Sequence, residues 1–230
     1  MDAPLAGNQF LKALIVDIDS KAVGSIALLE KVPAEHRELL GVALLEMYRL
    51  STCFYGCRGD GHIMESFIGR GYNQSVAAVH LISLGFYDEA MALTRGVGEI
   101  TNLITLMLLE FPKNFREWVE ADRSHRMRHF GPKSVRQKLT SLGHPALPMG
   151  DDEYAELSER FVHLNPGTVP NSHDVPRQGF IGGPIQEQGF TTSYDMLSTE
   201  VVALALTAAK ALSNEDVLNR VVAIVRDCGK

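Results

Sequence analysis

The stretch LGFYDEAMALTRGVGEITNLITLMLLE, residues 84–110, decides the fold class. Its second half is apolar on nearly every side of a helix, which predicts a deeply buried helix over residues 87–110 at the centre of a bundle. The apolar residues concerned are Leu103, Ile104, Leu106, Met107, Leu108 and Leu109. Gly85 stands at the end of the preceding helix, where a left-handed residue is favoured. Asp88 and Glu89 are acidic residues in the first turn of the helix that follows, where the helix dipole favours negative charge. We therefore expect a tight helical hairpin around Gly85.

The 3.6-residue period extends over most of the chain, because apolar residues recur at spacings of three and four. The expected helices cover residues 10–29, 33–54, 65–84, 87–110, 115 onward, 151–163, 194–212 and 214–228. Asn214 is expected to cap the last of them. No segment shows the alternation of a strand. The 230 residues are short enough for a single core, so we predict an all-α, single-domain bundle of about eight helices spanning residues 1–230.

One long segment lacks any sustained period. Residues 165–189 contain four prolines and five glycines, which predicts an irregular loop over about 164–193. Loops of this length are uncommon inside compact domains unless they bind a ligand, form a lid or contact a partner.

Composition excludes several classes of protein. The formal charge of −6 gives no global attraction to nucleic acid or to anionic membranes. The N-terminal residues lack the basic and apolar pattern of a signal peptide, and no window has 18 uninterrupted apolar residues. We therefore expect a cytoplasmic protein with no membrane contact.

The cysteines give little reason to expect a disulfide framework or a metal. Cys53, Cys57 and Cys228 are few and unevenly spaced. Cys53 and Cys57 lie four residues apart, but no second Cys or His pair stands nearby, so buried apolar thiols are favoured over a zinc site. We predict no metal and no cofactor.

Three polar residues share one face of the central helix. Arg95, Glu99 and Asn102 are spaced at i, i+4 and i+7. Buried charges persist only when they are paired and hydrogen-bonded. These residues are therefore expected to form a polar core, which either locks helix packing or lines a ligand pocket.

Residues 113–138 form the one strongly basic segment, with eight Lys or Arg against three acids. A solvated outer helix is the favoured interpretation, and contact with an RNA backbone or a small anion is the alternative. Asp122, His125 and His129 would share one face of this helix and could hold a transition metal. The neighbouring arginines would repel a cation, so this metal site is not favoured.

Two segments, LGFYDEAMALTRGVGEITNLITLML (84–108) and YAELSERFVHLNP (154–166), together resemble a bacterial family of uncharacterised all-helical proteins related to HEPN and abortive-infection domains. In such proteins a central helix carries an Arg followed by a Glu, which Arg95 and Glu99 match. A later helix leads from a Ser to a His, matched by Ser158 and His163.

The resemblance implies a bacterial helical bundle acting in stress response or phage defence, and in some HEPN proteins a metal-independent ribonuclease. Those enzymes use a His and an Arg spaced four to six residues before it. The candidates are His163 with Arg160 and His129 with Arg123. Arg160 lies only three residues before His163, and on an unbroken helix Arg123 and His129 would face different directions.

Three functional hypotheses follow. The first is a HEPN-like bundle that binds a partner protein or a small anionic ligand through the long loop and the basic helix. The second is a metal-independent ribonuclease, and the third is a structural interaction module that forms homodimers. The chain lacks P-loop, Rossmann, hydrolase and zincin motifs, and this absence does not decide whether it is an enzyme.

Overall fold

The computed structural model describes residues 21, 23–56, 60–144, 146 and 148–229. Residues 23–29 are helical and precede a 3₁₀ turn, η1 (Asp60–His62), and nine α-helices. These are α2 (Ala34–Ser51), α3 (Ile63–Ser83), α4 (Tyr87–Leu109), α5 (Lys113–Glu120), α6 (Arg123–Phe130), α7 (Pro132–Ser141), α8 (Asp151–Phe161), α9 (Glu187–Ala211) and α10 (Glu215–Cys228). No strand occurs among these residues, which confirms the all-α prediction.

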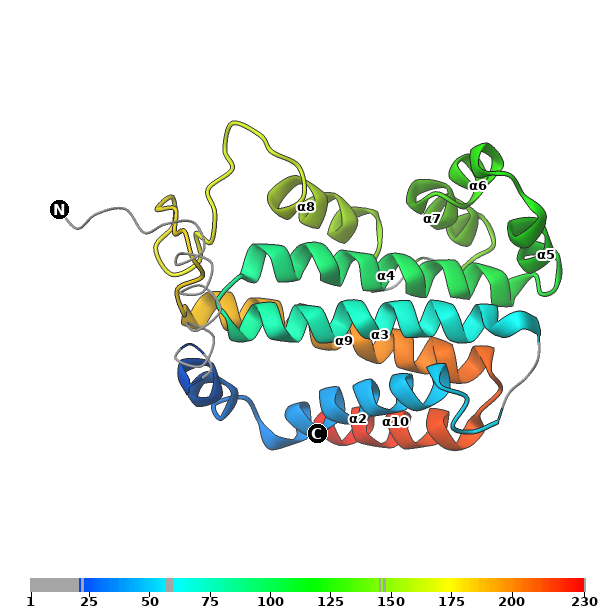
Figure 1. Ribbon diagram of the computed structural model, residues 1–230, viewed down its shortest axis with the longest axis horizontal. Coiled ribbons are helices and arrows are strands. Elements are labelled where there is room, and N and C mark those ends of the chain that lie inside the picture. The colour runs from blue at the N-terminus through cyan, green and yellow to red at the C-terminus, as the bar shows by residue number, and fades with distance from the viewer. Residues whose placement is uncertain (1–20, 22, 57–59, 145, 147, 230) are drawn as a thin grey trace, which may run out of the picture.

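Helix α4 lies at the centre of the bundle, as predicted. It packs against α3 and α9 on one side, while α7 and α8 cover its other side (Figure 1). Helices α2 and α10 lie along the far side of the α3–α9 pair. Val97, Ile104 and Met107 of α4 are fully buried. None of the described helices combines the length and the apolar content needed to cross a bilayer.

Two local predictions about helix ends are confirmed. Gly85 takes a left-handed backbone conformation, with φ of 77°, between α3 and α4. The Asn214 side chain accepts a hydrogen bond from the backbone N–H of Val217 at 3.1 Å, which caps α10.

The prediction of one long basic helix was wrong, because residues 113–141 form three short helices, α5, α6 and α7. Asp122 has an extended backbone, and its carboxylate accepts a hydrogen bond from the backbone N–H of His125 at 2.7 Å. This cap begins α6 and separates it from α5. Pro132 occupies the first turn of α7, after an extended Gly131. This division brings the number of helices above the expected eight.

The irregular loop is shorter than predicted, because α9 begins at Glu187 rather than near residue 194. The carboxylate of Asp174 accepts hydrogen bonds from the backbone N–H groups of Glu187 at 3.2 Å and Gln188 at 2.9 Å. Gly189 then lies against the Tyr87 ring, where a Cβ atom would stand 2.4 Å from Cδ2. A glycine that sequence analysis assigns to a loop is thus a packing residue of a helix.

Other helix boundaries differ by a few residues from the predictions. Helix α8 ends at Phe161, two residues before His163. Helix α2 ends at Ser51, and Cys53 follows with a left-handed φ of 56°. The predicted first helix is described only at residue 21 and over residues 23–29, and Cys57 lies outside the described residues.

Gly189→Ala and Gly41→Ala test this packing as a matched pair of helical glycines. A Cβ at Gly189 collides with Tyr87, so we expect a loss of about 1–3 kcal/mol of unfolding free energy. Gly41 of α2 has no heavy atom within 4 Å of its would-be Cβ, so alanine there should add about 0.5–1 kcal/mol. Urea unfolding measures both, and a shift in the same direction for the two variants would contradict this account.

Candidate functional site

The predicted polar core exists, and it joins α4 to α8. Arg95 donates a hydrogen bond from Nη1 to Ser158 Oγ at 3.0 Å, and its Nε lies 3.3 Å from Glu99 Oε1. Both charged side chains are mostly buried, at 18% and 26% exposure. The Tyr154 ring stacks with two guanidinium groups, whose Cζ atoms lie 5.0 Å (Arg95) and 3.8 Å (Arg136) from its centroid. The two segments that carry the family resemblance therefore meet at this contact.

Asn102 has a different role from Arg95 and Glu99. Its side chain is buried, and Nδ2 donates a hydrogen bond to the backbone carbonyl of Met149 at 2.8 Å. This bond anchors the segment before α8 to α4. Asn102 thus holds the packing of the two helices.

The acids around this core have raised pKa values. Burial raises the pKa of Glu99, and the charges of Arg95 and Arg136 together with a hydrogen bond from Tyr154 oppose that shift only in part. Burial also raises the pKa of Glu200 of α9 to about 8, and repulsion from Glu153 adds to the shift. Glu200 is therefore largely protonated at neutral pH.

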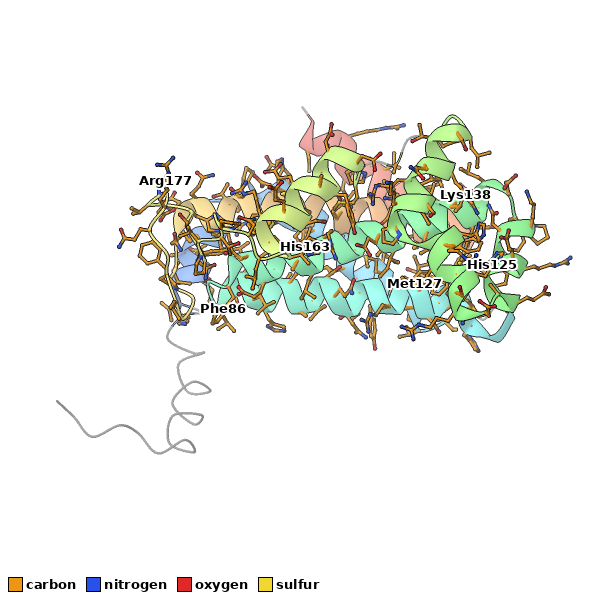
Figure 2. All side chains as sticks on the ribbon, turned by 90° about the horizontal axis from the view of Figure 1, so that it is seen from above. Phe86, His125, Met127, Lys138, His163 and Arg177 are labelled. Carbon is orange, nitrogen blue, oxygen red and sulfur yellow. The ribbon has the colours of Figure 1, made fainter. Side chains whose placement is uncertain are left out.

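His163 and Arg160 lie at the end of α8, and their side chains make no hydrogen bond with each other in the described structure. His163, labelled in Figure 2, is exposed. Its backbone N–H donates a hydrogen bond to the Ser158 carbonyl at 2.8 Å. Arg160 is exposed and pairs with Glu156, with 2.8 Å between Nη1 and Oε1. Arg160 also lines a polar pocket of about 330 Å³ that the long loop forms with α8 and that includes His173.

Arg123 and His129 lie on α6, which Figure 2 marks with His125 near one end of the molecule, well apart from His163. Helix α6 is continuous, so the two residues point about 120° apart around its axis. His129 stacks on His125, with ring centroids 4.2 Å apart, and His125 Nε2 lies 2.8 Å from Glu117 Oε1. This hydrogen bond lowers the pKa of Glu117. The structure therefore does not bring Arg123 and His129 together as a catalytic pair.

Asp122 does not join the metal-ligand face that sequence analysis considered, since its carboxylate caps α6. Glu117 of α5 takes its place beside the two histidines.

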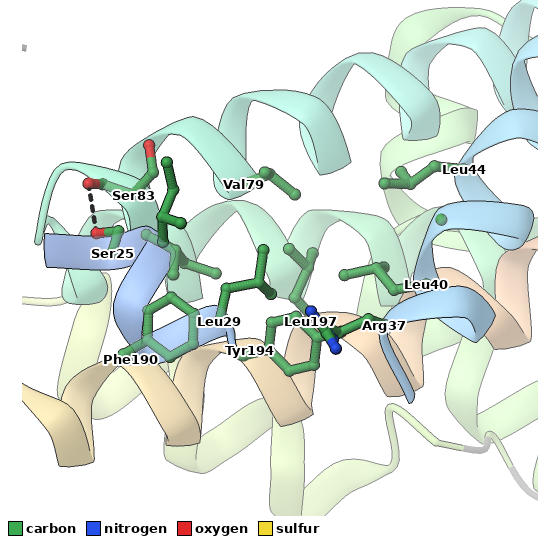
Figure 3. A pocket seen from close by; sticks show the side chains of 13 residues that line it. Ser25, Leu29, Arg37, Leu40, Leu44, Val79, Ser83, Phe190, Tyr194 and Leu197 are labelled. Carbon is green, nitrogen blue, oxygen red and sulfur yellow. Dashed lines mark hydrogen bonds between the residues drawn. The ribbon is translucent and has the colours of Figure 1, made fainter. Parts of the chain in front are cut away.

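Sequence analysis missed an apolar cavity between α2, α3, α9 and residues 25–29 (Figure 3). Its volume is about 280 Å³. The apolar side chains that line it are Ile26, Leu29, Leu40, Leu44, Val79, Ile82, Phe190 and Leu197. These residues come from four separate elements, so no local spacing in the sequence marks them as neighbours.

The few polar groups around the cavity are satisfied within the protein, with one exception. Ser25 donates a hydrogen bond to the Ser83 carbonyl at 2.7 Å (Figure 3). Tyr194 donates to the backbone carbonyl of His36 at 3.2 Å, and burial raises the pKa of its hydroxyl. Arg37 is exposed and has no carboxylate partner among the described residues. The cavity is therefore mainly apolar, and the Arg37 guanidinium at its edge has no carboxylate partner among the described residues.

Comparison of the chain with protein-family models, with curated proteins and with solved structures found no match.

Glu200→Gln tests the buried acid through the pH dependence of stability. With a folded pKa of about 8 against an ordinary value of 4.5, the folded state keeps a proton that the unfolded state releases between these values. The resulting stability is complete below about pH 4.5 and is lost as the pH rises through 8. We expect the wild type to lose on the order of 2–4 kcal/mol more than Glu200→Gln between pH 5 and 8.

Urea unfolding at several pH values checks this expectation, with Glu159→Gln on the exposed face of α8 as the control. Parallel pH profiles for wild type and Glu200→Gln would show that Glu200 ionises normally in the folded protein.

Proposed function

We propose that this protein binds a small amphiphilic anion, such as a medium-chain carboxylate, in the apolar cavity between α2, α3 and α9. The observation that carries the proposal is Arg37, which has no carboxylate partner among the described residues and lies beside a mainly apolar cavity of about 280 Å³. Apolar pockets with a few placed polar groups are the usual form of small-molecule sites. The hydrocarbon chain would enter the cavity, and the anionic group would stay in solvent beside Arg37.

The magnitudes favour modest affinity. A chain of about eight methylene groups gains about 6 kcal/mol on burial, at about 0.8 kcal/mol each. Association costs about 4 kcal/mol or more, which offsets most of this gain. An exposed ion pair with Arg37 contributes up to about 1 kcal/mol. The remainder is at most about 3 kcal/mol, which corresponds to a dissociation constant in the millimolar range, and the ion pair accounts for about fivefold of that affinity.

The proposed binder is the HEPN-like bundle of the first hypothesis, with a cytoplasmic role in bacterial stress or phage defence. The contact between Arg95 and Ser158 supports this relation, because it joins the two segments that resemble the family. The proposal moves the ligand from the long loop and the basic segment to the cavity. Partner proteins, a homo-oligomer and RNA on residues 113–138 stay predictions.

Isothermal titration of the full chain with decanoate, below the concentration at which it forms micelles, tests the binding. We expect saturable binding with a millimolar dissociation constant. Gly41→Leu should abolish binding without unfolding the protein, because Gly41 lines the cavity and its Cβ direction is open for 4 Å. Arg37→Gln should keep binding but weaken the affinity for decanoate about fivefold, because it removes only the ion pair.

Arg116→Gln removes an exposed arginine of α5, remote from the cavity lining, and serves as the charge control for Arg37→Gln. The proposal would be overturned if the wild type gave no heat of binding with decanoate, or if Gly41→Leu bound decanoate as tightly as the wild type.

A metal-independent ribonuclease is the second candidate, and one observation favours it. Ser158 connects the matched residues, because its hydroxyl accepts a hydrogen bond from Arg95 and its carbonyl accepts one from the backbone of His163. The exposed His163 could carry a proton, and an arginine could stabilise charge on phosphate.

Incubating the full chain in EDTA with a mixed pool of tRNA and single-stranded RNA tests this candidate. Cleavage should disappear in His163→Ala and persist in His129→Ala, since His129 lies on α6, away from this chain of bonds. Loss in His129→Ala alone would move the site to α6, and intact RNA in the wild-type reaction would eliminate the ribonuclease.

A further inference from the structure

A second group of functional side chains lies just beyond the C-terminal end of α2. Cys53, His62 and Glu65 each offer one ligand atom, and these atoms all lie within 4.8 Å of one another. Cys53 follows α2, His62 ends η1, and Glu65 lies in the first turn of α3. The turn between α2 and α3 therefore gathers a sulfur, a nitrogen and an oxygen donor in one place.

The spacing of the first two donors fits a tetrahedral metal. Cys53 Sγ lies 3.4 Å from His62 Nδ1. Zinc bonds of about 2.3 Å to sulfur and about 2.05 Å to nitrogen place these atoms about 3.6 Å apart at a tetrahedral angle. The Glu65 carboxylate would reach a metal ion bound to Cys53 and His62 by rotating about its terminal side-chain torsions.

Glu65 supplies an independent reason to expect a cation. Its side chain is only 4% exposed, and Oε1 is buried without a hydrogen-bond partner in the described structure. A buried carboxylate oxygen with no partner is costly, and a bound cation removes that cost.

The backbone at Cys53 and at His62 has an unusual conformation. Cys53 and His62 have φ angles of 56° and 59°, in the left-handed region that residues with side chains rarely occupy. Such conformations gather at functional sites. Sequence analysis considered Cys53 only with Cys57 and did not pair it with residues across the turn.

We infer that Cys53, His62 and Glu65 form a binding site for a divalent transition metal of the zinc class. A mixed sulfur, nitrogen and oxygen donor set suits zinc and its close analogue cobalt better than calcium or magnesium. Three protein ligands leave a fourth position open. His62 and Glu65 also line a cavity of about 480 Å³ that includes Arg70, so a water or small ligand could reach that position.

Another group of potential metal ligands consists of Glu117, His125 and His129. We expect this group to bind a metal more weakly than the Cys53 site. His125 and Glu117 already bond to each other at 2.8 Å, and both are about one-third exposed. This group has no sulfur ligand, which allows the two sites to be distinguished by spectroscopy.

Titration of the full chain, with its thiols reduced, with Co²⁺ tests the inference. A cobalt–thiolate bond produces an intense charge-transfer band in the near ultraviolet that histidine and carboxylate ligands do not give. We expect this band to saturate at one equivalent and to disappear when Zn²⁺ is added. Cys53→Ser should abolish it, and His62→Ala should weaken Co²⁺ binding at least about tenfold.

Cys228→Ser and His125→Ala are the matched controls, and both should keep the band with unchanged affinity. Far-ultraviolet circular dichroism verifies that each variant folds. His62 is exposed, so we expect the fold to tolerate its replacement by alanine. No band in the wild type, a band that survives Cys53→Ser, or loss of affinity in His125→Ala instead of His62→Ala would overturn the inference.

Discussion

The burial of α4 between α3, α9, α7 and α8 is the constraint on which the rest of the structure depends. Every polar side chain on such a helix must find a partner inside the protein. Thr94 and Thr101 bond to carbonyls of their own helix, at 2.9 Å and 3.0 Å. Arg95, Glu99 and Asn102 cannot be satisfied in this way, so they require α8 and the segment before it. The polar face of α4 therefore determines where α8 packs.

The sequence predicts the long helices well because their periodicity reports burial along a single element, as in α4. It also places Gly85 and Asn214 correctly, since both signals are local. The start of α9 was missed because it depends on Asp174, thirteen residues before the first amide that its carboxylate accepts from. The break before α6 is different, since a cap at Asp122 is a local signal that the run of basic residues concealed.

The difference between signals within one helix and contacts between distant segments also explains which functional residues the sequence could indicate. Arg95, Glu99 and Asn102 share one helix, and their spacing alone placed them on one face. Arg37 and Tyr194 meet at one cavity although 157 positions separate them in the sequence. Cys53 and Glu65 are closer along the chain, but four described residues with positive φ between positions 53 and 62 decide that their side chains converge. Backbone conformations of this kind leave no periodic pattern to detect.

Helix α2 connects the proposed anion cavity near its start with the proposed metal site beyond its end. Glu46 lies between them, 1% exposed, and accepts hydrogen bonds from Arg49 at 3.0 Å, from Tyr55 at 2.5 Å and from Arg220 of α10. Removing a partner from a buried charge typically costs about 3–5 kcal/mol, more than binding of a weak ligand supplies. Because α2 is fixed at this point, occupancy of the cavity should leave the metal ligands in place. The two sites are thus expected to bind independently, although one helix carries both.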